Sequence, residues 1–202
     1  AERDRLREDL HIDDMMADIE PLVEGSLEGA ERVSEIVQNL RRFSTPQEGQ
    51  LQAFDLIPVL KRAISWVLKA TTCNPQIETD FPDQLNLVNK EGYVHQILIN
   101  LIQNAMDAMT GQQDPKLELS VEQNSKVVRI RIHDNGSGIS EQNLVKIFDP
   151  FFTTKAVGSG TGLGLYISYG LATEQCQGDL SVQNHEQGGA EFTLTLPLDR
   201  KL

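Results

Sequence analysis

Apolar residues near the start of the chain recur at intervals of three and four. Their positions are Val23, Leu27, Ala30, Val33, Val37 and Leu40. This spacing predicts an amphipathic helix over residues 18–43, close to a seven-residue repeat. Such a helix can form one side of a bundle or coiled-coil seam, and the alternative is a helix that packs on its own domain.

A polar segment follows this helix. Residues 44–50 read Ser-Thr-Pro-Gln-Glu-Gly-Gln, and the proline disfavours helix in the residue before it. We therefore expect a boundary here, with residues 1–48 forming one unit and residues 49–202 another.

Beyond the boundary the apolar period changes repeatedly between that of a helix and that of a strand. Helices are predicted over residues 56–68, 91–109, 141–147 and 164–174. Strands are predicted over residues 76–81, 85–88, 117–121, 128–132, 179–183 and 190–196, with a hairpin turn at 123–125. The order favours an α+β fold, a two-layer sandwich in which helices cover one face of the sheet.

Composition restricts the function. The chain has 202 residues and a net charge of -12, with 39% hydrophobic residues and no run long enough to span a membrane. This charge repels nucleic acid and anionic membrane surfaces, so we expect neither as a partner. An acidic chain can still bind a nucleotide where backbone amides, a cation or a few basic groups hold the phosphates.

The first candidate motif is the polar stripe of the helix at 91–109. Asn100, Asn104 and Asp107 fall on one face, opposite the apolar positions. Amide and carboxylate oxygens are ligands suited to Mg²⁺, which shares phosphate oxygens with its substrate. The alternative is an ordinary solvated helix face.

The second motif follows an apolar strand and reads Asp134-Asn-Gly136-Ser-Gly138-Ile139. Glycines next to a carboxylate let the backbone bend and let a flat ring approach. Asp134 can accept a hydrogen bond from an exocyclic amine, a contact of about 1.5 to 3 kcal/mol that selects adenine. The alternative is an ordinary turn.

The third motif alternates glycine over residues 158–164 and opens a predicted helix, where backbone N–H groups can bind an anion. It lacks the Walker pattern and the setting of a dinucleotide fingerprint. Residues 148–155 precede it, and their aromatic residues around a proline are typical of a lid hinge. Lys155 is the best-placed cation for a terminal phosphate. The alternatives are a flexible linker and a solvated lysine.

In order and spacing, these motifs resemble the catalytic domain of sensor histidine kinases, in the superfamily shared with gyrase, heat-shock chaperone and mismatch-repair ATPases. The resemblance covers residues 51–198, with an N box at 100–108, glycine boxes at 134–138 and 160–164, and an F box at 148–152. It implies a Bergerat-type mixed sheet, ATP and Mg²⁺ as cofactors, and Asn104 as the metal ligand. The implied ATP-binding residues are Asn104, Asp107, Ala108, Asp134, Gly136, Gly138, Ile139, Phe148, Thr153, Thr154, Lys155, Gly160, Thr161, Gly162, Leu163, Gly164, Leu165 and Thr193.

Asn100 separates the activities within the superfamily, because the hydrolysing relatives place a glutamate there to activate water. A neutral amide is a poor general base, which favours phosphoryl transfer over hydrolysis. We therefore expect Asn100, Asn104 and Lys155 to be the catalytic residues. Many related kinases have a basic residue at the position of Asp107. Here we expect the Asp107 carboxylate to act through metal-bound water.

The segment at residues 31–44 resembles the second dimerisation helix of one histidine-kinase subclass, which implies a homodimer through residues 18–43. The phosphoacceptor motif of that subclass is not found in this chain. His11, His95, His133 and His185 lack its setting. We expect a cytoplasmic histidine kinase fragment whose acceptor helix lies outside this chain and whose signal passes to a response regulator receiver domain. No membrane contact by the fragment is expected, although the whole protein can carry an anchor. The alternatives are an ATPase of the same superfamily and a non-catalytic nucleotide-binding scaffold.

Overall fold

The computed structural model describes residues 19, 21–27, 29–30, 49–155, 160–198 and 200. Its centre is a five-stranded sheet with the order β2-β4-β5-β7-β6, and β1 pairs with β3 in a separate two-stranded sheet. The strands are β1 (Gln52–Asp55), β2 (Gln76–Asp80), β3 (Asn86–Asn89), β4 (Lys116–Gln123), β5 (Val127–Asp134), β6 (Asp179–Asn184) and β7 (Ala190–Pro197).

The large sheet is mixed, as predicted. β2 runs parallel to β4, whereas the other neighbouring pairs in this sheet are antiparallel. The predicted hairpin joins β4 to β5, where the Asn124 side chain accepts hydrogen bonds from the amides of Lys126 and Val127 at 2.9 and 3.0 Å. An asparagine that bonds to the backbone in this way fixes a tight turn.

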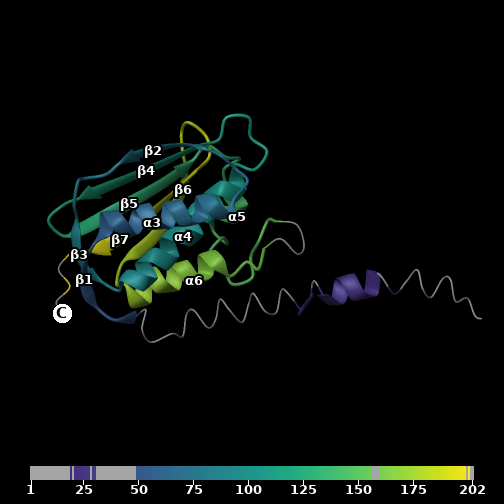
Figure 1. Ribbon diagram of the computed structural model, residues 1–202, viewed down its shortest axis with the longest axis horizontal. Helices are drawn as coiled ribbons and strands as arrows, with labels where there is room; N and C mark the ends of the chain where they lie inside the picture. The colour runs from purple at the N-terminus through teal and green to yellow at the C-terminus, as the bar shows by residue number, and fades with distance from the viewer. Residues whose placement is uncertain are drawn as a thin grey trace, which may run out of the picture.

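The helices lie on one face of the large sheet (Figure 1), so the predicted two-layer α+β sandwich is confirmed. They are α3 (Leu56–Ala70), α4 (Glu91–Ala108), α5 (Glu141–Leu144), α6 (Gly164–Gly170) and the π-helix η2 (Leu171–Gln175). The last predicted helix therefore continues to its expected end, but with wider turns, since the Cys176 amide donates to the Leu171 carbonyl at 2.8 Å.

Helix α4 is the central helix of this layer. Leu98, Leu101, Ile102 and Ala105 are at most 1% exposed, as their predicted core position requires. They pack between α3, the sheet and α6, so the polar stripe on the other side of α4 is held rigidly in place.

The start of α3 is fixed by Asp55. This residue caps the helix, with its side chain accepting from the Ile57 amide at 3.1 Å. It also accepts from the Leu85 amide at 3.0 Å, which ties α3 to the segment before β3. Strand β1, which ends at this residue, was not predicted.

Of the predicted amphipathic helix at 18–43, the structure describes residues 21–27 as helical and exposed, and most of the rest lies outside the described residues. His11 also lies outside them. Within the described residues, no helix combines the length and apolarity needed to cross a bilayer.

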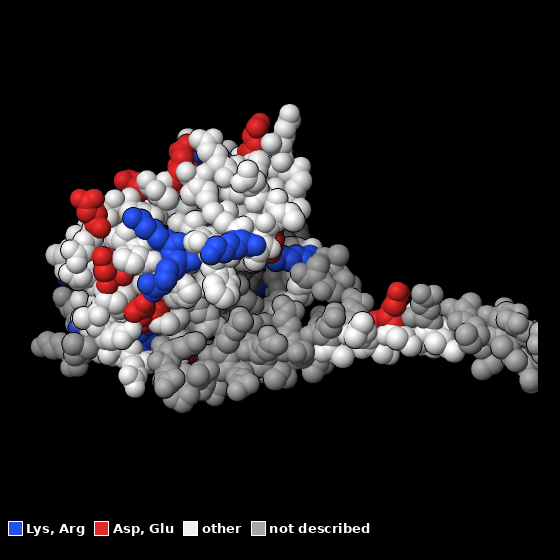
Figure 2. All heavy atoms as spheres, viewed as in Figure 1, with Lys and Arg blue, Asp and Glu red and all other residues white. Residues whose placement is uncertain are grey.

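Figure 2 shows one face of the molecule. Lys and Arg side chains gather across its centre, and Asp and Glu side chains lie toward its rim. The net negative charge is therefore unevenly distributed, and basic groups remain available for local contacts with an anion.

Candidate functional site

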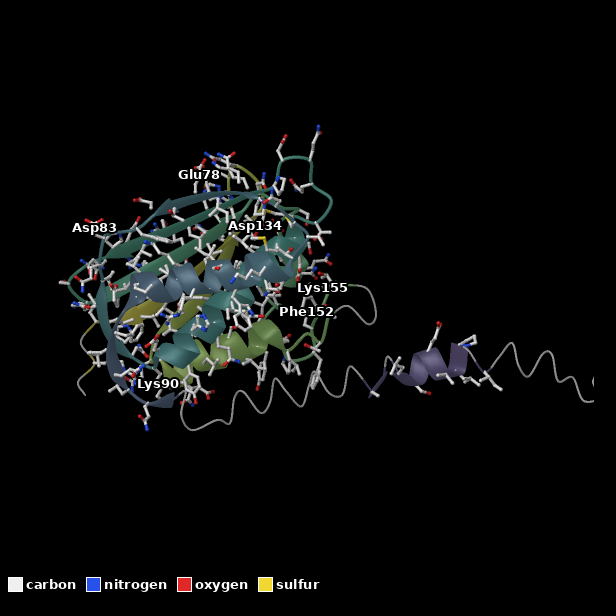
Figure 3. All side chains as sticks on the ribbon, in the orientation of Figure 1. Glu78, Asp83, Lys90, Asp134, Phe152 and Lys155 are labelled. Atoms are coloured by element: carbon white, nitrogen blue, oxygen red, sulfur yellow. The ribbon has the colours of Figure 1, made fainter. Side chains whose placement is uncertain are left out.

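A cleft of about 1290 Å³ opens between α4, the end of β5 and the segments around α6. Its volume is ample for a nucleoside triphosphate. Many of the residues predicted as a binding set line this cleft: Asn100, Asn104, Asp107, Ala108, Asp134, Gly138, Ile139, Thr153, Thr154, Lys155, Gly160, Thr161, Gly162, Gly164 and Leu165. The fold thus brings together motifs that are far apart in the sequence. In Figure 3, Phe152 and Lys155 lie together near one end of the helix layer, and Lys90, at the start of α4, lies toward the other.

Gly136, Phe148 and Leu163 were also predicted as contacts, but they support the cleft rather than line it. The Gly136 amide donates to Asp134 at 2.9 Å. The Phe148 ring packs against Tyr169 of α6 with 5.0 Å between centroids, and Leu163 is only 5% exposed. These residues join the walls of the cleft to the core.

Thr193 does not line the cleft, contrary to its prediction as an ATP-binding residue. Thr193 pairs with Arg131 and Ser181 and alternates with the buried Phe192, so it faces the side of the sheet that lacks the helices. Ala190 and Phe192 of the same strand line the cleft instead. Because successive side chains of β7 point to opposite faces of the sheet, Phe192 faces the cleft and Thr193 faces away from it.

Asp134 is the buried carboxylate of the cleft, 1% exposed at the end of β5. Its Oδ1 accepts from the Gly136 amide at 2.9 Å and from the Ala190 amide at 3.5 Å. Burial raises the pKa of Asp134 above the ordinary aspartate value, and these two amides oppose part of that rise. The carboxylate is fixed in orientation and poorly solvated, so a ligand that donates to it gains more than it would in water.

Glycines bring the backbone close to this carboxylate. A Cβ at Gly136 would lie 2.6 Å from the Ala108 carbonyl oxygen and 2.7 Å from Asp134 Oδ1. The loop after β5 can therefore close against the last turn of α4 only without a side chain at this position.

The polar stripe of α4 faces the helix α6 across the cleft. Asn100 donates from Nδ2 to the Ser168 hydroxyl at 2.9 Å. Its amide also occupies the space that a side chain at Gly164 would need, so α6 begins directly against Asn100. The side chain is thereby held in one orientation.

At the mouth of the cleft, Lys155 forms an ion pair with Asp107. Asp107 also accepts from Gln103 at 2.8 Å, one turn back on α4. The two charged side chains are about one third exposed, 37% and 33%. The segment that ends at Lys155 is therefore attached to the last turn of α4. The predicted lid beyond it includes residues 156–159, which lie outside the described residues.

The donor set of the cleft suits Mg²⁺. Asn100, Asn104 and Asp107 all line it from the same face of α4, and within the described residues no cluster of acidic, histidine or cysteine ligands forms a closed metal cage. An open set of amide and carboxylate oxygens fits an ion that keeps several waters and shares phosphate oxygens.

Two residues that support the cleft were missed by sequence reasoning. Ser168, 1% exposed, lies one turn beyond Gly164 on the side of α6 that faces Asn100, and helical spacing gives this position. Asn184, in β6, exchanges hydrogen bonds with Ile139, and no local pattern in the sequence reports this contact.

Comparisons with known proteins agree with this geometry. The family model described as histidine kinase-, DNA gyrase B-, and HSP90-like ATPase matches residues 89–200. The signal transduction histidine-protein kinase AtoS of Escherichia coli is 34% identical over 178 residues, which are 86% of this chain and 28% of that protein. The sensor histidine kinase ZraS of Escherichia coli is 32% identical over 182 residues, which are 84% of this chain and 36% of that protein.

Solved structures give the same result. The catalytic domain of histidine kinase ThkA, in a nucleotide-free form, matches with a TM-score of 0.65 and 28% identity, covering 74% of this chain and 98% of that one. A mycobacterial sensor histidine kinase, MprB, matches in fold with a TM-score of 0.64 at 20% identity, covering 73% and 97%. The chain spans 28% and 36% of the two curated relatives, so it corresponds to only a part of proteins of that kind.

Proposed function

Since the chain belongs to the family of histidine kinase-, DNA gyrase B- and HSP90-like ATPases, we propose that its cleft binds Mg-ATP and donates the γ-phosphoryl group to a histidine outside this chain. The observation that supports this most is the position of Asp134. A buried, oriented carboxylate lies at the end of β5 in the same cleft as Asn104 and the residues around Gly162. One end of the cleft thus suits adenine, and the other suits phosphates.

The adenine end is formed by Asp134 and the loop that follows it. The exocyclic amine of adenine donates to the Asp134 carboxylate, while the Ile139 and Phe192 side chains in the cleft wall exclude water. A charge-assisted hydrogen bond of this kind contributes about 1.5 to 3 kcal/mol. That is enough to favour adenine over a base that presents an oxygen at the same position.

The phosphate end is formed by Lys155 and by the backbone amides of residues 161–165, several of which line the cleft. These groups bind the phosphate oxygens and hold the terminal phosphate in line with the acceptor. Asn104 would hold Mg²⁺, and Asp107 would act through water on the metal. When bound, Mg²⁺ neutralises charge that develops on the β- and γ-phosphates.

Transfer needs little from the protein beyond this positioning. A neutral imidazole nitrogen of the acceptor attacks the γ-phosphorus with its lone pair, the bond to the β–γ bridging oxygen breaks, and ADP leaves with the electron pair. The attacking nitrogen carries no proton, and the proton on the other ring nitrogen leaves afterwards to water or to a base beside the acceptor, so the cleft itself needs no general base. Asn100, held by Ser168, fits this chemistry better than it fits the activation of water.

The remaining parts of the proposal concern the whole protein. Residues 1–48 are a partial dimerisation helix and linker, and residues 49–202 are the ATP-binding catalytic domain. A homodimer through residues 18–43 presents the acceptor histidine to this domain. A response regulator receiver domain takes the phosphoryl group next, as the similarity to sensor kinases suggests.

The test uses ATP labelled at the γ-phosphate. The chain is incubated with an acceptor helix that carries a histidine in a His-Glu-Ile-Asn-Asn-Pro-like setting, and without it. Label on the acceptor, stable in base and labile in acid, with little phosphate released in its absence, supports the kinase. Steady release of phosphate without the acceptor identifies an ATPase, and tight ATP binding with neither result identifies a scaffold.

A further inference from the structure

The turn between β6 and β7 forms part of the cleft wall. Ala190, the first residue of β7, lines the cleft and directs its amide toward Asp134 Oδ1 at 3.5 Å. Asn184, the last residue of β6, accepts from the Ile139 amide at 2.8 Å and donates to the Ile139 carbonyl at 2.6 Å. The position of this turn therefore determines the orientation of the Asp134 carboxylate and the position of the loop that follows β5.

The turn can come this close because it contains two glycines with positive φ. Gly188 has φ +98° and Gly189 has φ +76°. A side chain at Gly189 would overlap the backbone of Asp134. Glycine at this position therefore lets the backbone of the turn contact the backbone of Asp134 directly. The turn is closed by hydrogen bonds from the His185 amide to the Gly189 carbonyl at 3.0 Å and from the Gly188 amide to the His185 carbonyl at 2.9 Å.

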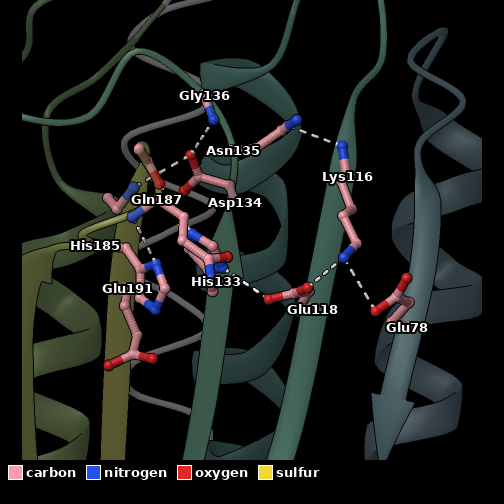
Figure 4. Close-up of polar contacts among 12 residues, drawn as sticks. Glu78, Lys116, Glu118, His133, Asp134, Asn135, Gly136, His185, Gln187 and Glu191 are labelled. Atoms are coloured by element: carbon pink, nitrogen blue, oxygen red, sulfur yellow. Dashed lines mark hydrogen bonds and ion pairs between the residues drawn. The ribbon is translucent and has the colours of Figure 1, made fainter.

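His133 holds the turn from the face of the sheet that lacks the helices. Its Nε2 donates to the Gly188 carbonyl at 2.9 Å, and its Nδ1 lies 2.9 Å from Glu118 Oε2. Its ring stacks on His185, with 3.9 Å between centroids. The side chain is only 9% exposed, and Figure 4 shows it between the turn and β4.

Both polar partners of His133 are acceptors. A backbone carbonyl and an ionised carboxylate have no proton to give, so both hydrogen bonds form only when each ring nitrogen carries a proton. Burial lowers the pKa of His133, but the Gly188 carbonyl and the Glu118 carboxylate outweigh it, and the pKa lies above the ordinary histidine value. The geometry thus favours an imidazolium cation.

The charges around His133 come from several elements. Glu118 lies on β4 and is itself bound at 2.5 Å by Lys116, which also contacts Glu78 of β2 at 3.1 Å. Glu191 of β7 is directly opposite His133 in the sheet, and His185 lies in the turn. Along β5 its charged neighbours are Asp134 and Arg131. The carboxylates of Glu118 and Asp134 stabilise its charge.

We propose that His133 is a positioning residue for adenine recognition: its charged ring fixes the β6–β7 turn, and the turn holds Asp134 in the orientation that reads the exocyclic amine. The inference rests on the proposed ATP site. His133 faces the other side of the sheet from the cleft and so acts only through the turn.

The measured quantity is the preference for ATP over inosine triphosphate, which carries an oxygen in place of the amine. Using this ratio cancels effects on the phosphates and on Mg²⁺, because they are common to both nucleotides. His133→Phe keeps the ring but loses both hydrogen bonds, and we expect the preference to fall about tenfold, or 1.4 kcal/mol. Arg131→Gln is the matched control, since it removes an outward ion pair two residues earlier on β5 without touching the turn.

The pH profile separates positioning from a purely structural role. In the wild-type protein the preference for ATP is expected to fall as the pH rises through the pKa of His133, because the deprotonated ring keeps only one of its two hydrogen bonds. Glu118→Gln removes the carboxylate that stabilises the charged ring, and its amide can donate to the neutral ring, so the fall with pH is expected to be reduced. This variant also serves if His133→Phe does not fold.

The possible results distinguish failure of the proposed adenine site from failure of the positioning role of His133. If wild-type protein shows no preference for ATP, or Asp134→Asn keeps it, the proposed adenine site is wrong. If Asp134→Asn loses the preference but His133→Phe keeps it at the level of Arg131→Gln, the positioning role is overturned while the site stands. An unchanged pH profile in Glu118→Gln also overturns the role.

Discussion

Lys155 and Asp107 form an ion pair across the mouth of the cleft, between the segment after Phe152 and the last turn of α4. The same ammonium group is the cation that we assign to the terminal phosphate. A bound nucleotide must therefore compete with the Asp107 carboxylate for the Lys155 ammonium group. Breaking this ion pair lowers the net free energy gained on binding.

Replacing Asp107 by Asn removes this competition. We expect the affinity for ATP in the absence of Mg²⁺ to rise about two- to fivefold, the scale of an exposed ion pair. The gain is expected to shrink when Mg²⁺ is present, because Asp107 then contributes through metal-bound water. Titration calorimetry with and without Mg²⁺ measures both values, and Lys155→Met is the control that lowers affinity. A loss of affinity in Asp107→Asn without Mg²⁺ would show that the pair does not compete with the nucleotide.

Asn104 is assigned to the metal. In Asn104→Ala, we expect the increase in ATP affinity on adding Mg²⁺ to disappear, while affinity without the metal stays near that of wild-type protein. Asn143→Ala removes another amide from the cleft wall and is the matched control. If the magnesium dependence survives in Asn104→Ala, as it is expected to in Asn143→Ala, the metal assignment is wrong.

Two glycines of α6 allow a direct comparison. Gly164→Ala places a Cβ in the space held by the Asn100 amide, whereas a Cβ at Gly170 meets nothing within 4 Å. We expect Gly164→Ala to lower the free energy of unfolding by about 1 to 3 kcal/mol and to reduce phosphoryl transfer. Gly170→Ala is expected to be neutral or to stabilise by about 0.4 to 1 kcal/mol. Equal effects of the two substitutions in urea unfolding would argue against the contact between Asn100 and α6.

Acid stability depends on Glu118. The hydrogen bond from Lys116, followed by that from His133, lowers the pKa of Glu118 from 4.5 to about 2. Because its folded pKa is depressed, Glu118 stabilises the protein fully above its unfolded pKa, and this contribution is lost as the pH falls from about 4.5 toward about 2.

We therefore expect Glu118→Gln to flatten the pH dependence of the urea midpoint in this acidic range, and to destabilise the protein at neutral pH. Glu78→Gln is the control, because Glu78 contacts Lys116 but its side chain makes no described contact with His133. A steep acid transition that persists unchanged in Glu118→Gln would contradict the assignment of this stability to Glu118.

The sequence predicts the elements with a strong period and a large buried face. Helix α4 and strands β4 and β5 are long, and their apolar residues recur at one clear spacing, so their location follows from local pattern alone. Strand β1 was missed because its four residues are exposed or half-buried and acquire their conformation only by pairing with β3. The parallel pairing of β2 with β4 joins segments separated by α4, and no local signal specifies it.

The site was predicted where chemistry and spacing coincide. Asn104, Asp134 and the residues around Gly162 could be assigned to one cleft because each lies in a short motif of unusual composition. The error at Thr193 arose because strand alternation was not applied to β7, where Ala190 and Phe192 face the cleft. The contact of His133 with the β6–β7 turn depends on a fold that brings residues 133 and 188 together, so it could not be predicted from sequence.

The central claim is that Asp134 reads adenine in this cleft, and the most direct measurement is a titration of wild-type protein and Asp134→Asn with Mg-ATP. Burial raises the pKa of Asp134, so its ionised form costs stability above that pKa. The neutral Asn is therefore expected to keep or raise the free energy of unfolding at neutral pH. It turns an amide donor toward the amine of adenine, so we expect ATP affinity to fall about 10- to 100-fold. A folded Asp134→Asn protein that binds ATP as tightly as wild-type protein would contradict the account.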